Sequence, residues 1–315
     1  MRCCSPLQAY YYIRPDGKKD LKFVSSKCPR KFKQYRDILL DVPCGQCINC
    51  RLRRSADWAT RVVKELGFHD MSCFLTLTYD DDHLPSDNSL VKKDLQKFFK
   101  RLRKRCEKSF RYSFVRGDDL VTRDVSYPKL SYFAVGEYGD RTERPHYHVI
   151  LFGLYPHDFK YYKDTSTGEV LYTSEWLTDI WQHGHVVVGD VSFESAAYCA
   201  RYCLKKVTGK DAEEHYAGRV PEFSLTSKGI GKAYYEKFAS QVYAQDAVVV
   251  RGHKRTPPRY FDLFLALDDE DKYKAIKDAR IVSMAERRGV DDEDRLRTEG
   301  IVQEAKMNFF KRDLK

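Results

Sequence analysis

The sequence predicts an α+β fold in which an antiparallel sheet is flanked by helices, with a cysteine-rich N-terminal segment and a helical C-terminal extension. Three observations lead to this prediction. Between residues 51 and 207 the patterns follow the order helix, strand, helix, strand, strand, strand, helix. Two of these strands follow each other across a short polar connection, as in a hairpin, instead of alternating with helices. Six of the ten cysteines fall within the first 50 residues.

The first 50 residues have few periodic apolar positions and are expected to be irregular. Residues 1–60 hold 13 Lys and Arg against 5 Asp and Glu, which accounts for most of the net charge of +10. A second basic run, residues 92–116, holds 11 basic and 2 acidic side chains. Localised positive charge attracts polyanions, because phosphate contacts release counterions. The charge favours a nucleic-acid partner, and a solvated surface that maintains solubility is the alternative.

The next three elements are a helix, a strand and a second helix. Residues 51–66 place apolar and small side chains at helical spacing, and "CFLTLTY" (73–79) alternates as a half-buried strand does. A helix is expected to begin near Leu90 with Ser89 as its cap, and its side chains are largely basic outside one apolar stripe. That stripe consists of Leu90, Val91, Leu95, Phe98, Phe99 and Leu102.

A hairpin is predicted from strands 130–138 and 146–152, which the polar sequence "GDRTERP" connects. A further strand at 185–191 precedes a helix at 192–207, with Ser192 or Ser195 near its cap.

The chain divides into a basic cysteine-rich segment (1–60), a core (61–210) and a charged, mostly helical extension (211–315), of which residues 265–315 have no assigned role. The longest apolar stretch, "HVILFGLY", is much shorter than the roughly 20 residues of a membrane span. The N-terminus lacks the apolar region of a signal peptide. We therefore expect a soluble protein that acts in a cytosol.

His146 and His148 lie two apart on a predicted strand, so both side chains point to one face. Glu137 is near the end of the preceding strand, across the hairpin. Two imidazoles and a carboxylate can hold a divalent ion and leave positions open for substrate. The same triad resembles a non-haem iron oxygenase site, and a pair of purely structural histidines is the other alternative.

Tyr198 and Tyr202 are four apart on the predicted helix and share one face with Lys205. A free tyrosine is a poor nucleophile because its pKa is about 10. A nearby ammonium favours the phenolate, and a metal can polarise the electrophile. Two tyrosines beside a metal are suited to attack a phosphodiester and to store its energy as a phosphotyrosine. Two half-buried structural tyrosines are the alternative.

A His-hydrophobic-His strand followed by a Tyr-x3-Tyr-x2-Lys helix resembles the HUH endonucleases of rolling-circle replication, in their two-tyrosine form. Four stretches resemble, more closely, the replication initiators of the gokushovirus branch of the microviruses. They are "CGQCINCRLRRSADWATR", "FLTLTYDDDHLP", "VGEYGDRTERPHYHVILFG" and "LTSKGIGKAYYEKF". The resemblance extends from about Cys4 to Arg259, and Tyr147 departs from it because a plain hydrophobe is usual between the two histidines.

This resemblance implies an RRM-like nuclease core and a role for each candidate residue. Thr76 and Thr78 would support the site. The metal ligands would be Glu137, His146 and His148, the nucleophiles Tyr198 and Tyr202, and the helix lysine Lys205.

The resemblance also implies a mechanism and partners. With Mg²⁺ or Mn²⁺ bound, one tyrosine would become linked to the 5′ end of the single-stranded viral origin, and the free 3′-OH would prime a host polymerase. The second tyrosine would cut the regenerated origin, and the strand would be closed into a circle. No G-x-x-x-x-G-K-[ST] loop is present, so a host helicase is expected to unwind the DNA in the host bacterial cytoplasm. The stretch "KGIGKA" (228–233) is expected to form a turn at a helix start.

Three cysteines, Cys44, Cys47 and Cys50, are spaced like metal ligands, and zinc usually takes four. We expect Cys4 as the fourth ligand, with Cys3 or Cys28 as substitutes. Free thiols and an iron–sulfur cluster are the alternatives, and the proposed chemistry does not need redox. A structural zinc would order a basic segment that has little core of its own. The other cysteines, expected to be small buried hydrophobes, are Cys73, Cys106, Cys199 and Cys203.

The basic residues that we expect to contact DNA lie in both basic runs and after the tyrosine helix. They are Arg51, Arg53, Arg54, Lys97, Arg101 and Lys206. A zinc-ordered DNA-binding protein without catalysis would use the same charge and cysteines, and it is the main alternative. A metal-dependent oxygenase, or a two-tyrosine transposase or relaxase, is also compatible with parts of the pattern.

Overall fold

The computed structural model describes residues 3–17, 19–23, 40–106, 110–116, 119–125, 130–139, 142–165, 168–201, 206–207, 212–288 and 293–313. The chain forms two compact units, one of residues Ser55–Tyr273 and one of Met1–Arg54 with Lys274–Lys315. The first boundary between them falls within helix α1 (Ile48–Leu66). The division into parts 1–60, 61–210 and 211–315 remains a prediction about function.

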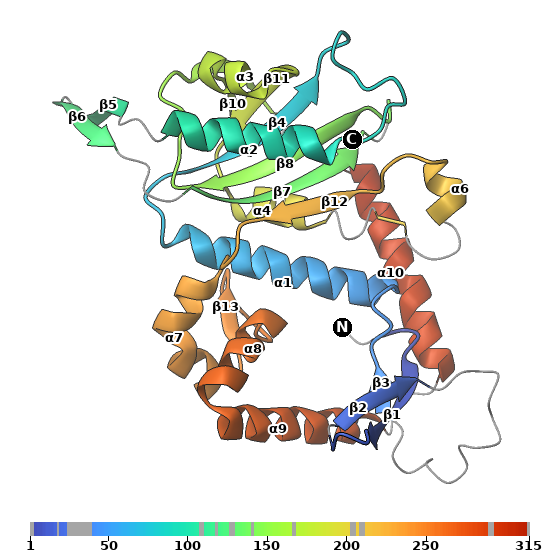
Figure 1. Ribbon diagram of the computed structural model, residues 1–315. Coiled ribbons are helices and arrows are strands. Elements are labelled where there is room, and N and C mark those ends of the chain that lie inside the picture. The colour runs from blue at the N-terminus through green and yellow to red at the C-terminus, as the bar shows by residue number, and fades with distance from the viewer. Residues whose placement is uncertain are drawn as a thin grey trace. The chain divides into compact units, whose positions relative to one another are not determined.

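Among the described residues of the larger unit, seven strands form one antiparallel sheet in the order β12-β7-β8-β4-β11-β10-β9 (Figure 1). The strands are β4 (Ser72–Tyr79), β7 (Ser131–Tyr138), β8 (Pro145–Phe152), β9 (Lys160–Asp164), β10 (Val170–Thr173), β11 (Gly184–Gly189) and β12 (Phe223–Thr226). The predicted α+β class is confirmed. The four expected strands are β4, β7, β8 and β11. The other three were missed, since each has only four or five residues.

Helices pack on this sheet, and two small hairpins complete the unit. The helices are α2 (Lys92–Cys106), α3 (Glu175–Trp181), α4 (Phe193–Ala200), α6 (Ala212–Tyr216), α7 (Lys232–Ala244) and α8 (Arg259–Asp268). The hairpins pair β5 (Phe110–Arg116) with β6 (Asp119–Val125) and β13 (Val248–Val250) with β14 (His253–Arg255). The expected cap Ser89 does not start α2. Its hydroxyl accepts a hydrogen bond from the backbone of Val220 (2.9 Å), and the helix begins at Lys92.

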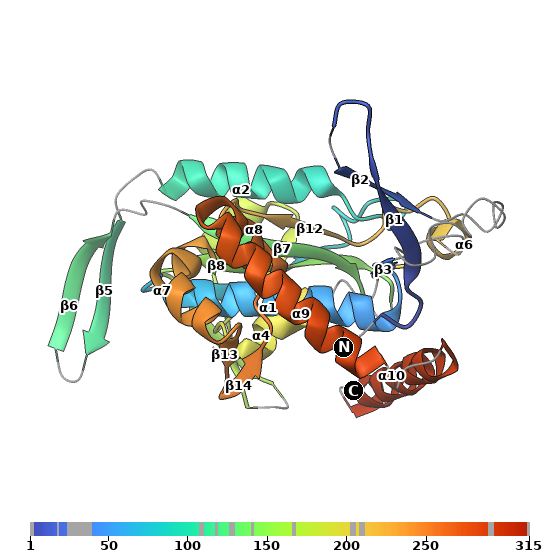
Figure 2. The ribbon, with the colours of Figure 1, turned by 90° about the horizontal axis from the view of Figure 1, so that it is seen from below.

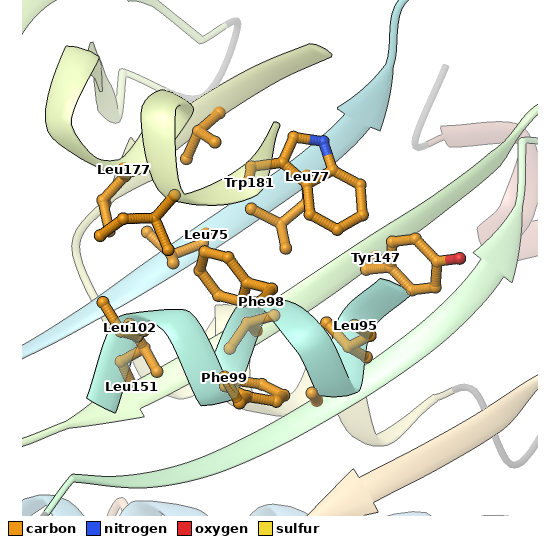
Figure 3. Packing of buried hydrophobic residues seen from close by; sticks show 14 of the residues in the cluster. Leu75, Leu77, Leu95, Phe98, Phe99, Leu102, Tyr147, Leu151, Leu177 and Trp181 are labelled. Atoms are coloured by element: carbon orange, nitrogen blue, oxygen red, sulfur yellow. The ribbon is translucent and has the colours of Figure 1, made fainter. Parts of the chain in front are cut away.

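The main hydrophobic core lies between one face of the sheet and helices α2 and α3. In Figure 3, side chains of α2 such as Phe98 and Leu102 point toward Leu75, Leu77 and Trp181. Tyr147 of β8 belongs to this core and is fully buried. Its hydroxyl lies 2.9 Å from that of Tyr79 and accepts a hydrogen bond from the Val91 backbone (2.9 Å), which explains why a polar ring fits here.

The second hydrophobic core lies on the other face of the sheet. It joins Phe133, Val135, Ile150 and Phe152 of β7 and β8 to α1 and α4. Figure 2 shows α2 on one side of these strands and α4 on the other. Since side chains alternate along a strand, His146 and His148 of β8 lie on the α4 side, opposite to Tyr147. The two faces of the sheet therefore have different neighbours.

The smaller unit contains a three-stranded antiparallel sheet in the order β2-β1-β3. Its elements are β1 (Leu7–Ile13), β2 (Lys19–Phe23), β3 (Leu40–Val42), the start of α1, most of α9 (Glu270–Arg288) and α10 (Glu293–Asp313). The expectation of an irregular N-terminal segment was therefore wrong for these strands. Across the described ranges, none of the helices combines the length and the apolar character that crossing a bilayer requires.

Candidate active site and cysteine cluster

The pairing of β7 with β8 assembles a group of possible metal ligands. Glu137 pairs directly with His146, and His148 is two residues further along the same face. One ligand atom from each of these three residues lies within 4.8 Å of the other two. The structure thus brings together the three residues that the sequence proposed as ligands.

Hydrogen bonds fix the orientation of both imidazole rings. His146 Nδ1 lies 3.2 Å from the carbonyl oxygen of Arg144, and because a carbonyl only accepts, Nδ1 is the protonated nitrogen. His148 Nδ1 lies 3.1 Å from Oγ1 of Thr76, and its ring stacks on Phe74 at 5.5 Å between centroids. Arg144 also binds the end of β4, through Asp81 (2.7 Å). Such contacts orient metal-binding histidines and hold the tautomer with Nε2 as the ligand atom.

The donor set suits a divalent cation. Glu137 is 1% exposed and His148 is 6% exposed, so both groups are almost removed from water. A buried carboxylate is stabilised by a cation, and carboxylate oxygen with imidazole nitrogen binds Mn²⁺ and similar metals. The residues present therefore fit a bound metal ion.

Tyr198 reaches the same place from helix α4. Its ring packs edge-on against His148, with 4.9 Å between the ring centroids. Arg201 lies over the same ring, with its Cζ 5.3 Å from the centroid. The next residue, Cys199, is buried in the core below, where burial first and then the charge of Glu137 raise its pKa well above the usual value. Tyr202 and Lys205, the other two proposed residues, lie outside the described residues.

Helix α4 is held in place at its start and from below. Ser192 and Ser195 form a capping box, in which each side chain binds the backbone of the other. The first turn is tied to β13–β14 by an ion pair between Glu194 and Arg251. Underneath, Ile230 shares the second hydrophobic core with Ala196 and Cys199. The ring of Tyr198 is therefore presented by a helix whose backbone is anchored.

The loop that carries Ile230 was expected to be a turn at a helix start, and this is confirmed. Gly231 is the N-cap of α7, with a φ of 81° that favours glycine. Its backbone N–H donates to the buried carboxylate of Glu65 (2.6 Å), and Arg61 donates to the carbonyl of Ile230 (3.0 Å). Helix α1 thus fixes the loop under α4.

Comparison with known proteins agrees with this geometry. The family model for the "Replication-associated protein ORF2" family matches residues 72–207, from β4 to just beyond α4. The "Replication-associated protein VP4" of Bdellovibrio phage phiMH2K is 34% identical over 87% of this chain and 80% of its own length. This chain belongs to the microvirus-type phage replication initiators. Its relatives include the "Replication-associated protein ORF2" of Spiroplasma virus 4, 31% identical over 87% of this chain and 83% of that protein.

A further relative is the "Replication-associated protein ORF4" of Chlamydia phage 1, which is 30% identical over 80% of this chain and 61% of its own length. No solved structure matches this initiator. The family membership supports a role in phage DNA replication. The matched range holds all of Glu137, His146, His148 and Tyr198, whereas the N-terminal cysteines precede it.

Those cysteines form a second group of possible metal ligands in the smaller unit. The sulfur atoms of Cys3, Cys44, Cys47 and Cys50 lie within 4.8 Å of one another. The expected fourth ligand, Cys4, is not part of this group. Successive side chains of an extended segment point in opposite directions, and Cys4 instead approaches α10, where a Cβ on Gly300 would lie 3.1 Å from its sulfur. Cys28, the other substitute, lies outside the described residues.

Backbone N–H groups point at these sulfurs. Gln46 (3.4 Å) and Cys47 (3.3 Å) donate to Cys44, and Cys44 donates to Cys3 (3.3 Å). Burial acts to raise the pKa of Cys47, but hydrogen bonds from the backbones of Cys4 and Cys50 and from the Cys50 and Cys44 side chains outweigh it and lower this pKa to about 6. Donors of this kind stabilise thiolates, which are the form that binds metals.

The basic residues proposed to bind DNA fall in different places. Arg51, Arg53 and Arg54 follow the cysteine cluster on α1, and Arg53 and Arg54 are exposed. Lys97 is exposed on α2. Arg101 has a structural role that its basic neighbours did not suggest, because it donates to the carbonyls of Ile180 and Trp181 (2.7 Å each) and caps α3. The last member, Lys206, is half-buried in the short segment after the tyrosine helix.

Sequence reasoning underestimated two residues. Thr76 was assigned only a supporting role, and it contacts His148 directly. The alternation of β4, whose other side chains are buried, places Thr76 on the metal face and carried that signal. Cys3 was treated as a substitute ligand, and no local pattern separates two adjacent cysteines.

Proposed function

We propose that this initiator is an HUH-type endonuclease that nicks and joins single-stranded DNA at the phage origin through a 5′-phosphotyrosine. The observation that carries the proposal is the packing of Tyr198 against His148 beside Glu137 and His146. A nucleophile and a cation site meet there on an anchored scaffold. Family membership supports the same role, since its relatives act in phage replication.

Glu137, His146 and His148 would hold Mg²⁺ or Mn²⁺. When bound, the ion supplies Lewis-acid polarisation of the scissile phosphate. The protein's own residues do the rest. Thr76 and the Arg144 carbonyl keep the two rings oriented, and the side chain of Arg201, which lies over the Tyr198 ring, supplies positive charge near the phenol. Positive charge favours the phenolate over the phenol.

In the proposed step, the phenolic oxygen of Tyr198 attacks phosphorus and the bond from phosphorus to the 3′ oxygen breaks. The phenol loses its proton to solvent and the leaving 3′ oxygen gains one, so the step is balanced without an external energy source. Tyr202 would be the second nucleophile, one helical turn further, and Lys205 its positively charged neighbour. This part of the proposal is supported by the i, i+4 spacing and by the family resemblance.

The 3′-OH would prime a host DNA polymerase in the bacterial cytoplasm, and a host helicase would open the duplex. Arg51, Arg53 and Arg54 would contact DNA phosphates next to the cut strand. The released end would attack the first phosphotyrosine after one round and close the circle.

The cysteine cluster would hold a structural zinc ion. Four thiolates are the ligand set that zinc prefers in closed structural sites, and an ion there would connect residue 3 to the start of α1. We expect zinc at a stoichiometry of one per chain in wild type, measured by atomic emission after purification without chelator. The Cys3→Ser variant should lose this zinc and the matched Cys4→Ser variant should keep it. Equal zinc loss in both variants would contradict the assignment of Cys3.

The nickase itself is tested with a single-stranded oligonucleotide that carries the phage origin, incubated with Mn²⁺ and separated on a denaturing gel. Wild type should form a covalent protein–DNA band, and Tyr198→Phe, Tyr202→Phe and the double variant are compared with it. A band that only the double variant loses identifies two interchangeable nucleophiles. Absence of any adduct with a proven origin strand would refute the nickase and leave a zinc-ordered DNA-binding protein.

A further inference from the structure

Helix α2 carries a continuous row of lysines on its outer side. Lys93, Lys97, Lys100 and Lys104 are all exposed and recur every three or four residues, which is the spacing of one face of a helix. The buried side chains lie on the opposite face of the helix. They are Leu95, Phe98, Phe99, Leu102 and Cys106. We call the four lysines the lysine stripe.

Little negative charge opposes the stripe. The only acidic residue of α2 is Asp94, which accepts a hydrogen bond from the buried Tyr79 (3.0 Å) and lies 3.9 Å from the ammonium of Lys97. On the neighbouring helix α3, the exposed Glu175 is bound to Lys160 (2.7 Å). Two further basic side chains, Lys92 and Arg103, flank the stripe and lie over the rings of Phe223 and Tyr132. The outer side of α2 therefore attracts anions.

The stripe lies on the wrong side of the sheet to hold the strand that is cut. Helix α2 covers the face with Tyr147, whereas the metal triad and Tyr198 lie on the face with α4 (Figure 2). A nucleic acid on α2 must therefore be a different segment from the one at the active site.

The chemistry of the stripe fits duplex DNA better than a single strand. Surfaces for single strands stack bases on exposed aromatic rings, and here Phe98 and Phe99 point inward into the core. From Lys93 to Lys104 the helix rises about 16 Å, at 1.5 Å per residue. This length corresponds to roughly five successive phosphates along one strand of a B-form duplex. Four lysines in line can thus follow one backbone without reading bases.

We propose that the lysine stripe binds the phosphate backbone of duplex DNA without sequence preference. Where the proposed nickase function also holds, on which this second clause rests, the protein grips duplex DNA on one face of its sheet and cuts a single strand on the other. This would keep the initiator on the template next to the nick.

The test compares two full-length variants of equal net charge. In the first, all four lysines of the stripe are changed to Gln; in the second, four exposed lysines elsewhere are changed to Gln, namely Lys237, Lys254, Lys274 and Lys277. The probe is a fluorescent duplex of about 20 base pairs without an origin, in the absence of divalent ions, titrated over a range of KCl concentrations. Counterion release predicts a slope of about −0.9 per phosphate contact.

The stripe variant should lose about 2–4 units of slope on the duplex, and the control variant less than about 1. Equal losses in both variants, or an unchanged slope, would overturn the proposal. A loss as large on a single strand of the same length would overturn the assignment to duplex DNA. Covalent adduct formation on the origin strand, measured separately, reports only on the nickase, so the two proposals can fail independently.

Discussion

Thr76→Val tests whether Glu137, His146 and His148 bind a metal, without touching a ligand. The hydroxyl of Thr76 lies 3.1 Å from His148 Nδ1, on the side of the ring away from the expected ligand atom. Valine keeps the shape and removes this hydrogen bond. Partners of this kind change metal affinity by about 10- to 100-fold, which corresponds to about 1.4–2.7 kcal/mol. We expect the dissociation constant for Mn²⁺ to rise by this factor.

The assay is Mn²⁺ binding by isothermal titration, together with adduct formation as a function of Mn²⁺ concentration. The half-saturating concentration should shift by the same factor, while adduct formation at saturating Mn²⁺ stays within a few-fold of wild type. Thr78→Val is the matched control, since Thr78 lies on the same face of β4 and its hydroxyl faces the His185 carbonyl at 3.4 Å instead of a metal ligand. Identical Mn²⁺ affinities for Thr76→Val and Thr78→Val would refute the assigned role of Thr76.

Two further predictions concern stability. Tyr147→Phe should lower the free energy of unfolding by about 1–3 kcal/mol in urea titrations, because the backbone N–H of Val91 loses its acceptor; the exposed Tyr162→Phe should change it by less than about 0.5 kcal/mol, and similar values for both would contradict the role of the Tyr147 hydroxyl. Burial lowers the pKa of His183 below its usual value of 6.5, with Asp94, Arg101, His83 and Lys97 as the charged neighbours. Below about pH 6.5 the unfolded chain then binds more protons than the folded one, so stability falls as the pH drops. The urea midpoint of His183→Gln should fall less than that of wild type between about pH 7.5 and 5.5, and parallel falls would show that His183 is not responsible.

The main features of the site were readable from local sequence. Strand periodicity alone places His146 and His148 on one face, and the short connection makes β7 and β8 a hairpin, so Glu137 returns opposite to His146. The three-residue spacing of Cys44, Cys47 and Cys50 likewise needs only local chain geometry to bring the sulfurs together. These contacts involve residues close in sequence, where few backbone conformations are compatible with the pattern.

Contacts between distant segments were decided only by the tertiary structure. Strand β12 has four residues and pairs with β7, nearly ninety positions earlier, and nothing in "FSLT" announces this partner. Arg101 looks like its basic neighbours in sequence, yet only it meets the carbonyl groups that end α3. Such outcomes depend on which surfaces meet after folding.

The cysteine cluster shows both levels together. The sequence by itself determined that three thiols gather before α1, because their spacing leaves little choice. Whether Cys3 or Cys4 joins them depends on how β1 pairs with β3 and on which side of the extended chain then faces Cys47. Likewise, the sequence marked α2 as basic, and only its packing on the Tyr147 face separated its lysines from the active site. Side-chain chemistry and local periodicity are written along the chain, whereas the face that each element presents is fixed by burying apolar surface against distant segments.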